Sequence, residues 1–150
     1  MRDRLVVFAL GDQRYGLPLS AVEHIVRAVA VTSLPQAPDI VLGVVNVQGR
    51  LIPVINLRRR FRLAEHEVAL SDQMLIARTE RWTVALMVDA VIGVLEYAEQ
   101  ETVAVQELLP GLRYVEGVVK LDDGLILIHD LDKFLSLEEE TALHLAMERA

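Results

Sequence analysis

Residues 43–57, GVVNVQGRLIPVINL, recur 74 positions later as residues 117–131, GVVKLDDGLILIHDL. Six of the fifteen aligned positions are identical, and both copies place a turn between two runs of Val, Ile and Leu. Two such runs around a short turn are typical of a β-hairpin. A hairpin that occurs twice, in the same order relative to its neighbours, predicts a duplicated fold.

A second offset extends the repeat toward the N-terminus. At a spacing of 69 residues, the matching pairs are Leu17 with Leu86, Ala21 with Ala90 and Val22 with Val91. Further hairpins are predicted at residues 4–19 and 73–88, and hairpins at 41–55 and 115–129 contain the first repeat. Most segments are therefore strands. We predict a mainly β fold of two similar β-barrels or sheets packed side by side.

Short helical turns are predicted after each hairpin, because polar residues that cap helices stand there. These residues are Ser20, Asn56, Asp89 and Asp130. Ser20 with Glu23, and Ser136 with Glu139, also have the spacing of a capping box. A C-terminal helix over 137–149 is predicted to follow the second half. The chain is then one domain with duplicated halves, roughly 1–66 and 67–136.

Composition excludes several classes of protein. The chain has 150 residues, 53% of them hydrophobic and 25% charged, which is enough apolar material for a core. Its net charge of −7 has the wrong sign for binding nucleic acid or an anionic membrane. No cysteine is present, so disulfides and cysteine-ligated metals are excluded and a cytoplasmic location is expected. No stretch approaches the roughly 20 apolar residues needed to cross a bilayer.

The residues show no pattern typical of catalysis, a metal or a cofactor. The histidines His24, His66, His129 and His144 are not spaced like the ligands of a helical metal site. His129 and Asp130 are neighbours, and neighbours in an extended segment point to opposite faces. No serine lies in a Gly-x-Ser-x-Gly turn, and no glycine-rich loop precedes a helix. We therefore expect a protein-binding function with no catalytic residue, metal or cofactor.

An arginine run stands out in this acidic chain: Arg58, Arg59, Arg60 and Arg62. It is either a solvated face or a patch that binds carboxylates of an acidic partner. Gly43 and Gly117 occupy equivalent places in the repeat. We expect tight backbone approach at both.

A family resemblance runs in order through the whole chain. The residues that carry it are Val7, Phe8, Leu10, Gly11, Tyr15, Gly16, Leu17, Val22, Ile25, Pro35, Pro38, Gly43, Val44, Asn46, Gly49, Arg50, Pro53, Val54, Leu57, Phe61, Leu86, Val88, Asp89, Val91, Val94, Gly117, Leu131 and Leu135. Over Leu5 to about Leu137, the chain resembles the CheW-like family, the adaptors of bacterial chemosensory arrays. The resemblance implies two five-stranded β-barrel subdomains. It also implies a non-enzymatic adaptor that couples methyl-accepting chemoreceptors to the regulatory domain of a CheA-type histidine kinase.

The resemblance also implies two interaction surfaces. Receptor-binding candidates, carried over residue by residue, are Val22, Ile25, Asn46, Gln48, Gly49 and Arg50. The kinase-binding candidates lie in one proline-containing segment and are Leu34, Pro35, Pro38 and Ile40. Receptor helices are expected to meet the groove between the barrels, and the kinase to pair through barrel ends.

One turn departs from the family pattern. Where the family usually has Asn-Leu-Arg-Gly, this chain has Asn46, Val47, Gln48 and Gly49. A neutral amide replaces a guanidinium there, so a charged contact is weakened or lost. This change leaves a second hypothesis open: an accessory protein of another motility or chemosensory pathway that binds kinase or receptor without coupling them. A small-molecule-binding β-barrel enzyme is a third hypothesis.

Overall fold

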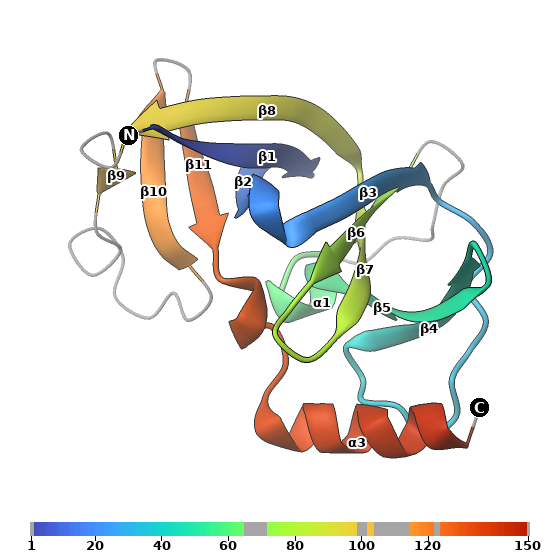
Figure 1. Cartoon of the computed structure of the whole chain (residues 1–150). Coiled ribbons are helices and arrows are strands. Elements are labelled where there is room, and N and C mark those ends of the chain that lie inside the picture. The colour runs from blue at the N-terminus through green and yellow to red at the C-terminus, as the bar shows by residue number, and fades with distance from the viewer. Residues whose placement is uncertain (1, 65–71, 99–101, 104–114, 122–123, 150) are drawn as a thin grey trace.

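The computed structural model describes residues 2–64, 72–98, 102–103, 115–121 and 124–149 (Figure 1). The chain is mainly β, as predicted. Its strands are β1 (Arg2–Leu10), β2 (Gln13–Pro18), β3 (Val22–Arg27), β4 (Val41–Val47), β5 (Arg50–Ile55), β6 (Gln73–Arg78), β7 (Thr83–Val88), β8 (Ala90–Ala98), β9 (Thr102–Val103), β10 (Val115–Leu121) and β11 (Gly124–His129). The helical elements are η1 (Leu19–Ala21), α1 (Leu57–Arg60), η3 (Leu131–Lys133) and α3 (Leu137–Glu148).

All four predicted hairpins are confirmed: β1–β2, β4–β5, β6–β7 and β10–β11. The β4–β5 turn shows why its sequence was informative. Gln48 and Gly49 form the two-residue loop, with φ angles of 53° and 83°. Positive φ at both positions matches the right-handed twist of the flanking strands, and glycine adopts it at no steric cost.

The strands form two sheets of the same design. Sheet A has the order β8-β1-β2-β11-β10-β9, and sheet B has the order β3-β6-β7-β5-β4. Apart from the two-residue β9, both contain five strands, and in both a parallel contact joins two hairpins: β2 with β11, and β7 with β5. The prediction of two similar five-stranded subdomains is thereby confirmed.

The two sequence halves are not the two spatial units, however. Sheet A combines β1 and β2 with β8, β10 and β11, and sheet B combines β3, β4 and β5 with β6 and β7. The chain crosses between sheets through η1 and again at Asp89, the single residue between β7 and β8. Each sheet is therefore built from both halves of the chain.

The short helical turn predicted after the first hairpin is present as η1, but Ser20 does not cap it, and the turn predicted after the third hairpin is wrong. Ser20 lies inside η1, which has no side-chain cap, and Glu23 is a residue of β3. Asp89 leads into β8 instead of a helix. The β-branched residues that follow favour extended backbone, and β6 and β1 offer edges with which the new strands pair.

The caps at the other three positions are confirmed. Asn56 begins α1 by accepting a hydrogen bond from the Arg59 amide at 3.0 Å. Asp130 caps η3. Ser136 and Glu139 form a complete capping box at the start of α3. In the described residues, no helix is long and apolar enough to cross a membrane.

Alternation along the strands divides the apolar residues among three cores. On β1, Leu5 and Val7 pack in a small core that is formed by strands of sheet A alone. Val6 and Phe8, on the other face of β1, pack in a larger core between the sheets. On β6, Met74 and Ile76 pack in a second small core that is formed by sheet B, whereas Leu75 and Ala77 pack in the core between the sheets. Strands covered on both faces have no polar side, which explains the weak polar alternation of these segments.

Helix α3 closes the lower end of the core between the sheets (Figure 1). Leu143 and Ala146 are buried in that core. Glu139 pairs with Arg60 of α1, and Glu140 pairs with Arg81 at 3.0 Å. The helix is thus attached to two separate segments that precede it in the chain.

Candidate protein-binding surface

The tip of the β4–β5 hairpin is an ordered, exposed turn. The Asn46 side-chain oxygen accepts a hydrogen bond from the Gly49 amide at 2.9 Å, which closes the turn. Gln48 and Gly49 are exposed at its end. Because the Asn46 side chain hydrogen-bonds to the backbone of its own turn, it stabilises the turn, and the exposed groups of Gln48 and Gly49 remain available to a partner.

Arg50, the first residue of β5, folds back from the tip over the end of sheet B. Its guanidinium donates a hydrogen bond to the Thr83 hydroxyl of β7 at 3.0 Å. It also contacts the Glu23 carboxylate of β3 at 3.5 Å. The Arg50 side chain is still 53% exposed, so it can meet a partner.

The remaining receptor-binding candidates lie on β3, an edge strand of sheet B. Val22 is half-buried and packs on the core between the sheets. Ile25 is 46% exposed, which is unusual for a large apolar side chain on a strand. Because Arg50 pairs with Glu23 of the same strand, the structure brings the predicted hairpin tip and the predicted β3 residues together.

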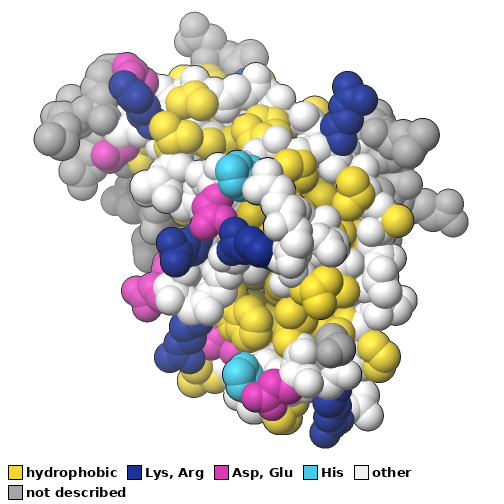
Figure 2. Space-filling model, turned by 45° about the vertical axis from the view of Figure 1, so that its right-hand side comes forward, with side chains coloured by type: hydrophobic (Ala, Val, Ile, Leu, Met, Phe, Trp, Pro, Cys, Tyr) yellow, Lys and Arg dark blue, Asp and Glu magenta, His cyan; other side chains and the backbone are white. Residues whose placement is uncertain are grey.

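Apolar side chains gather on the face shown in Figure 2, between charged ones. Sequence reasoning missed two exposed apolar side chains as candidates for binding, namely Ile92 and Val94 of β8. They are 56% and 58% exposed on an edge strand of sheet A. The 69-residue offset would have found one of them, because it aligns Ile25 with Val94. Each sheet therefore has an edge strand that carries exposed β-branched side chains.

The predicted kinase-binding segment is only partly on the surface. Leu34 and Ile40 are buried in the core between the sheets, where they are unable to contact a partner of the folded protein. Pro35 is exposed and Pro38 is half-buried. The prolines are the members of this set that remain candidates for contact.

The arginine run is mostly engaged within the chain. Arg58 donates to both oxygens of Asp89, at 2.7 and 2.8 Å, and Arg60 pairs with Glu139. Arg59 donates to the Asp39 carbonyl oxygen, and Arg62 is exposed. The run is thus neither a purely solvated face nor an open cationic patch, because half of it forms partly buried ion pairs.

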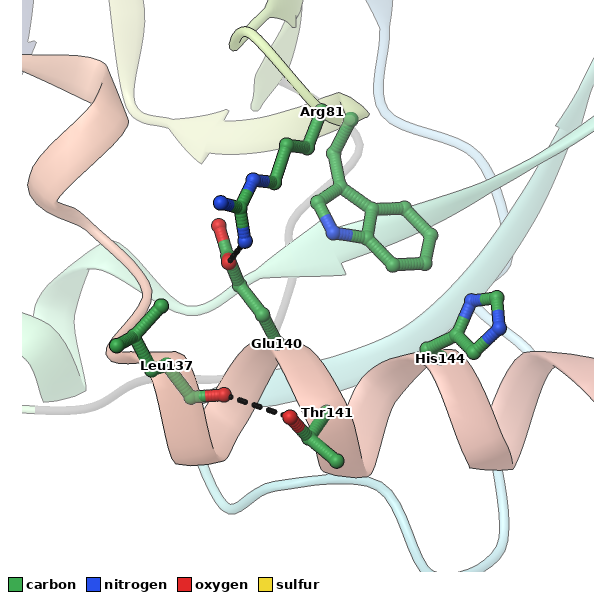
Figure 3. A pocket seen from close by; sticks show the side chains of 6 residues that line it. Arg81, Leu137, Glu140, Thr141 and His144 are labelled. Atoms are coloured by element: carbon green, nitrogen blue, oxygen red, sulfur yellow. Dashed lines mark hydrogen bonds and ion pairs between the residues drawn. The ribbon is translucent and has the colours of Figure 1, made fainter.

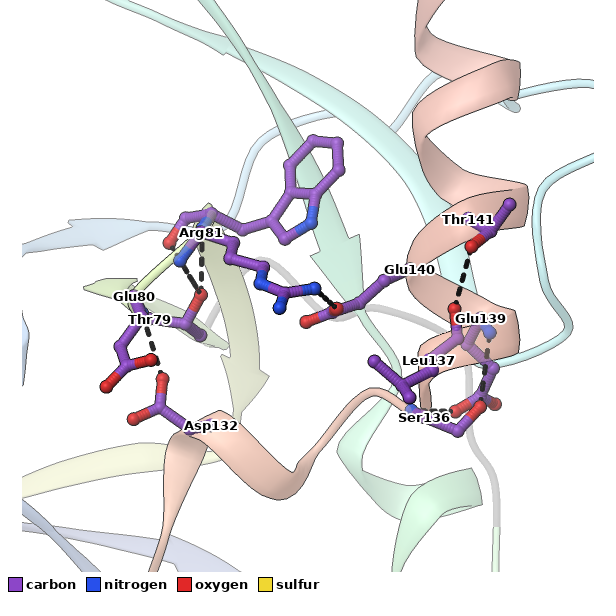
Figure 4. Close-up of polar contacts among 10 residues, drawn as sticks. Thr79, Glu80, Arg81, Asp132, Ser136, Leu137, Glu139, Glu140 and Thr141 are labelled. Atoms are coloured by element: carbon purple, nitrogen blue, oxygen red, sulfur yellow. Dashed lines mark hydrogen bonds and ion pairs between the residues drawn. The ribbon is translucent and has the colours of Figure 1, made fainter.

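A hollow of about 320 Å³ separates the β6–β7 turn from α3 (Figure 3). Its walls are Arg81, Trp82, Leu137, Glu140, Thr141 and His144. The Arg81–Glu140 ion pair spans the hollow, and the indole of Trp82 meets the His144 ring edge-on at 6.4 Å. Figure 4 shows the turn attached to η3, where the Glu80 amide donates to Asp132 at 2.9 Å. These contacts attach α3 and η3 to sheet B.

His129 forms no catalytic pair with Asp130. Its ring lies in an aromatic cluster, 4.5 Å from Phe61 and 5.2 Å from Tyr15. Burial lowers the pKa of His129 to about 4, although a backbone hydrogen bond at Leu127 opposes the shift. The ring is therefore neutral at pH 7 and belongs to the packing, whereas Asp130 caps η3.

Two other groups have shifted pKa values. Burial raises the pKa of Tyr15, against the influence of the Arg58 charge. Burial also disfavours the ionised form of Glu139, but hydrogen bonds from Ser136 and Arg60 outweigh it and hold its pKa below the usual value. Within the described ranges, no three His, Asp or Glu side chains are grouped so as to hold a metal ion.

Comparisons with known proteins agree with this geometry. The model of the CheW-like domain matches residues 4–139. The chain is 29% identical over 142 residues to the chemotaxis protein CheW of Treponema pallidum, covering 91% of this chain and 84% of that protein. The crystal structure of the scaffolding protein TtCheW from Thermoanaerobacter tengcongensis superposes with a TM-score of 0.83 at 29% identity, covering 93% of this chain and 96% of that one. Protein FrzA of Myxococcus xanthus is 29% identical over 86 residues, which are 57% of this chain and 54% of FrzA.

Proposed function

Because the chain belongs to the CheW-like family, we propose that it is a non-enzymatic adaptor of chemotaxis signalling. It couples methyl-accepting chemoreceptors to a CheA-type histidine kinase. It acts in the cytoplasm, at the arrays that the membrane-bound receptors form. The carrying observation is the family match over residues 4–139, together with a two-sheet fold in which an edge strand of each sheet carries exposed apolar side chains.

The receptor side of the adaptor is the surface around β3 and the β4–β5 tip. It combines the exposed Ile25 with a guanidinium, Arg50, that is held by two strands. Ile92 and Val94 of β8 are exposed apolar side chains on an edge strand of sheet A and are added to the receptor-binding candidates. Apolar side chains next to a charge suit an amphipathic helix, which is the form of a chemoreceptor's cytoplasmic tip.

The kinase side lies elsewhere on the molecule. Its candidates are Pro35 and Pro38, on the segment whose Leu34 and Ile40 belong to the same core as Leu143 and Ala146 of α3. In the family, the regulatory domain of CheA-type kinases shares this fold. The end of one of its sheets can therefore pair with the end of a sheet of this protein. Separate surfaces on one rigid body allow both partners to bind together.

An accessory role is the second candidate function. Gln48 stands where the family usually has an arginine, so the charge at the turn itself is missing. The partial match to FrzA also shows that not every similar protein is named as a chemotaxis CheW protein. An accessory protein would bind kinase or receptor without activating the kinase.

Reconstitution with purified partners separates these functions. The protein is mixed with the kinase and with receptor-containing membranes from the same genome, and kinase autophosphorylation is followed. An adaptor raises the rate only when all three components are present. An accessory protein binds, lowers the rate supported by the genuine adaptor, and activates nothing alone.

A further inference from the structure

Glu23 is the extra residue of a β-bulge. On β3, Val22 pairs with Ala77 and His24 pairs with Ile76, so Glu23 has no partner on β6. A bulge redirects one side chain and locally increases the twist of its strand. Here it directs the Glu23 carboxylate to the guanidinium of Arg50, at 3.5 Å.

The duplicated strand has the same bulge with a different residue. On β8, Gly93 pairs with Val7 and Val91 pairs with Phe8, which leaves Ile92 unpaired. Ile92 is 69 positions after Glu23, the offset of the repeat. The β-bulge is thus present in both sheets, but only in sheet B does the bulged residue place a carboxylate beside a guanidinium.

Stability is a poor explanation for the Glu23–Arg50 pair. The two side chains are 27% and 53% exposed, and pairs at this exposure contribute little to the free energy of folding. What the arrangement does achieve is order. Arg50 is held from two sides, by Glu23 of β3 and by Thr83 of β7.

We propose, on the basis of the receptor-side surface described above, that Glu23 is a positioning residue. It holds the Arg50 guanidinium so that it binds a carboxylate on an amphipathic helix of the receptor. The guanidinium has five N–H donors, and the contacts within the described residues use two of them. Ile25 of β3, the strand that carries Glu23, is an exposed apolar side chain of the same receptor-side surface.

The positioning step is measurable without any partner. Arginine-selective ¹⁵N NMR follows rotation of the Arg50 guanidinium about its Nε–Cζ bond. Rotation is expected to be slow in the unaltered protein and several-fold faster in Glu23→Gln. Equal rates in both proteins would overturn the proposal.

The effect on binding is measured as a double-mutant cycle. Glu23→Gln, Arg50→Gln and the double variant are titrated with a helical-hairpin fragment of a receptor's cytoplasmic tip. Each single variant is expected to bind about threefold to tenfold more weakly, and the double variant no more weakly than Arg50→Gln, because Glu23 acts through Arg50. Additive losses, or tighter binding by Glu23→Gln, would overturn the proposal.

The chain offers a matched control in Glu140→Gln. Glu140 also pairs with an arginine, Arg81 at 3.0 Å, but it lies on α3, outside the receptor-side surface. Its receptor affinity should equal that of the unaltered protein. Titration with the kinase regulatory domain distinguishes failure of this proposal from failure of the proposed function. If the unaltered protein binds the kinase domain but no receptor fragment, the receptor side of the proposed function is refuted. The NMR result still decides whether Glu23 positions Arg50.

Discussion

Arg58 of α1 forms a bidentate ion pair with Asp89, which stands at one of the two places where the chain crosses between the sheets. The guanidinium of Arg58, in α1, donates to both carboxylate oxygens of Asp89, the residue at which the chain passes from sheet B to sheet A. Asp89 also accepts a hydrogen bond from the Gly11 amide in the β1–β2 turn at 2.8 Å. One carboxylate therefore connects a helix, a turn and the junction between the sheets.

Asp89→Ala is expected to lower the free energy of unfolding by about 2 kcal/mol, because Arg58 and the Gly11 amide lose a charged, partly buried acceptor. Urea denaturation measures the change. Ser20→Ala is the control, since Ser20 is the repeat-equivalent residue at the other crossover, is exposed and caps nothing in η1. A loss of equal size at both sites would contradict the role assigned to Asp89.

Gly43 and Gly117 are equivalent in the repeat but not in space. A Cβ atom on Gly43 would lie 2.2 Å from the Thr32 carbonyl oxygen, and Gly43 has a φ of +153°. On Gly117 the nearest atom would be 3.8 Å away, so the expectation of tight backbone approach there is wrong.

Gly43→Ala is therefore expected to cost about 3 kcal/mol or more, since backbone must move to relieve the clash. Gly117→Ala should change stability by less than about 1 kcal/mol. Thermal denaturation of both variants checks the contrast, and equal losses would contradict the assignment of close backbone approach to Gly43 and not to Gly117.

Acid should destabilise the protein through His129. Its pKa is about 4 when folded and 6.5 when unfolded, so only the unfolded chain takes up a proton as the pH falls through that interval. The loss of stability begins below pH 6.5 and reaches about 3 kcal/mol at pH 4. Glu139 also loses its contribution in acid, as the pH falls from the ordinary carboxyl pKa through its depressed folded pKa.

His129→Phe tests how much of the acid destabilisation comes from His129, because phenylalanine retains an aromatic ring among Tyr15, Phe61 and Phe134. Urea denaturation of both proteins at several pH values between 4 and 7 should give a smaller decline for the variant. Parallel pH profiles would mean that His129 is not the group responsible.

Exposed apolar residues of the two edge strands should matter for binding and not for folding. Ile25→Arg and Val94→Arg are expected to weaken binding of a receptor-tip fragment about tenfold or more, as central apolar contacts of an interface do. Their melting temperatures should stay within a few degrees of the unaltered protein. Leu145→Arg, on the exposed side of α3, is the control and should bind normally.

The sequence predicted the strands well because the decisive signals were local. A glycine-containing turn between runs of β-branched residues identifies a hairpin whichever sheet it joins, as at Gln48 and Gly49. The sequence did not predict that each sheet contains strands from both halves of the chain. The repeat of residues 43–57 is equally compatible with one sheet per half and with two sheets that each combine strands of both halves. That choice depends on long-range pairing of β2 with β11 and of β5 with β7.

The binding surface was predictable in part. Ile25 is exposed and Leu34 is buried, yet both are aliphatic residues in an apolar stretch, and only the three-dimensional packing of the core between the sheets distinguishes them. Ser20 and Glu23 had the spacing of a capping box, but strand pairing with β6 prevailed over that local preference. The Glu23–Arg50 contact depends on a bulge and on three strands, which no local pattern encodes.

The most direct test is whether two partners bind this protein at once. The regulatory domain of a CheA-type kinase from the same genome is titrated into the protein by calorimetry, and a receptor-tip fragment is then added to the complex. We expect both titrations to give dissociation constants of about micromolar, the range of modest transient interfaces, and a ternary complex of the three. Failure to bind the regulatory domain of any kinase of that genome, or displacement of one partner by the other, would contradict the adaptor function.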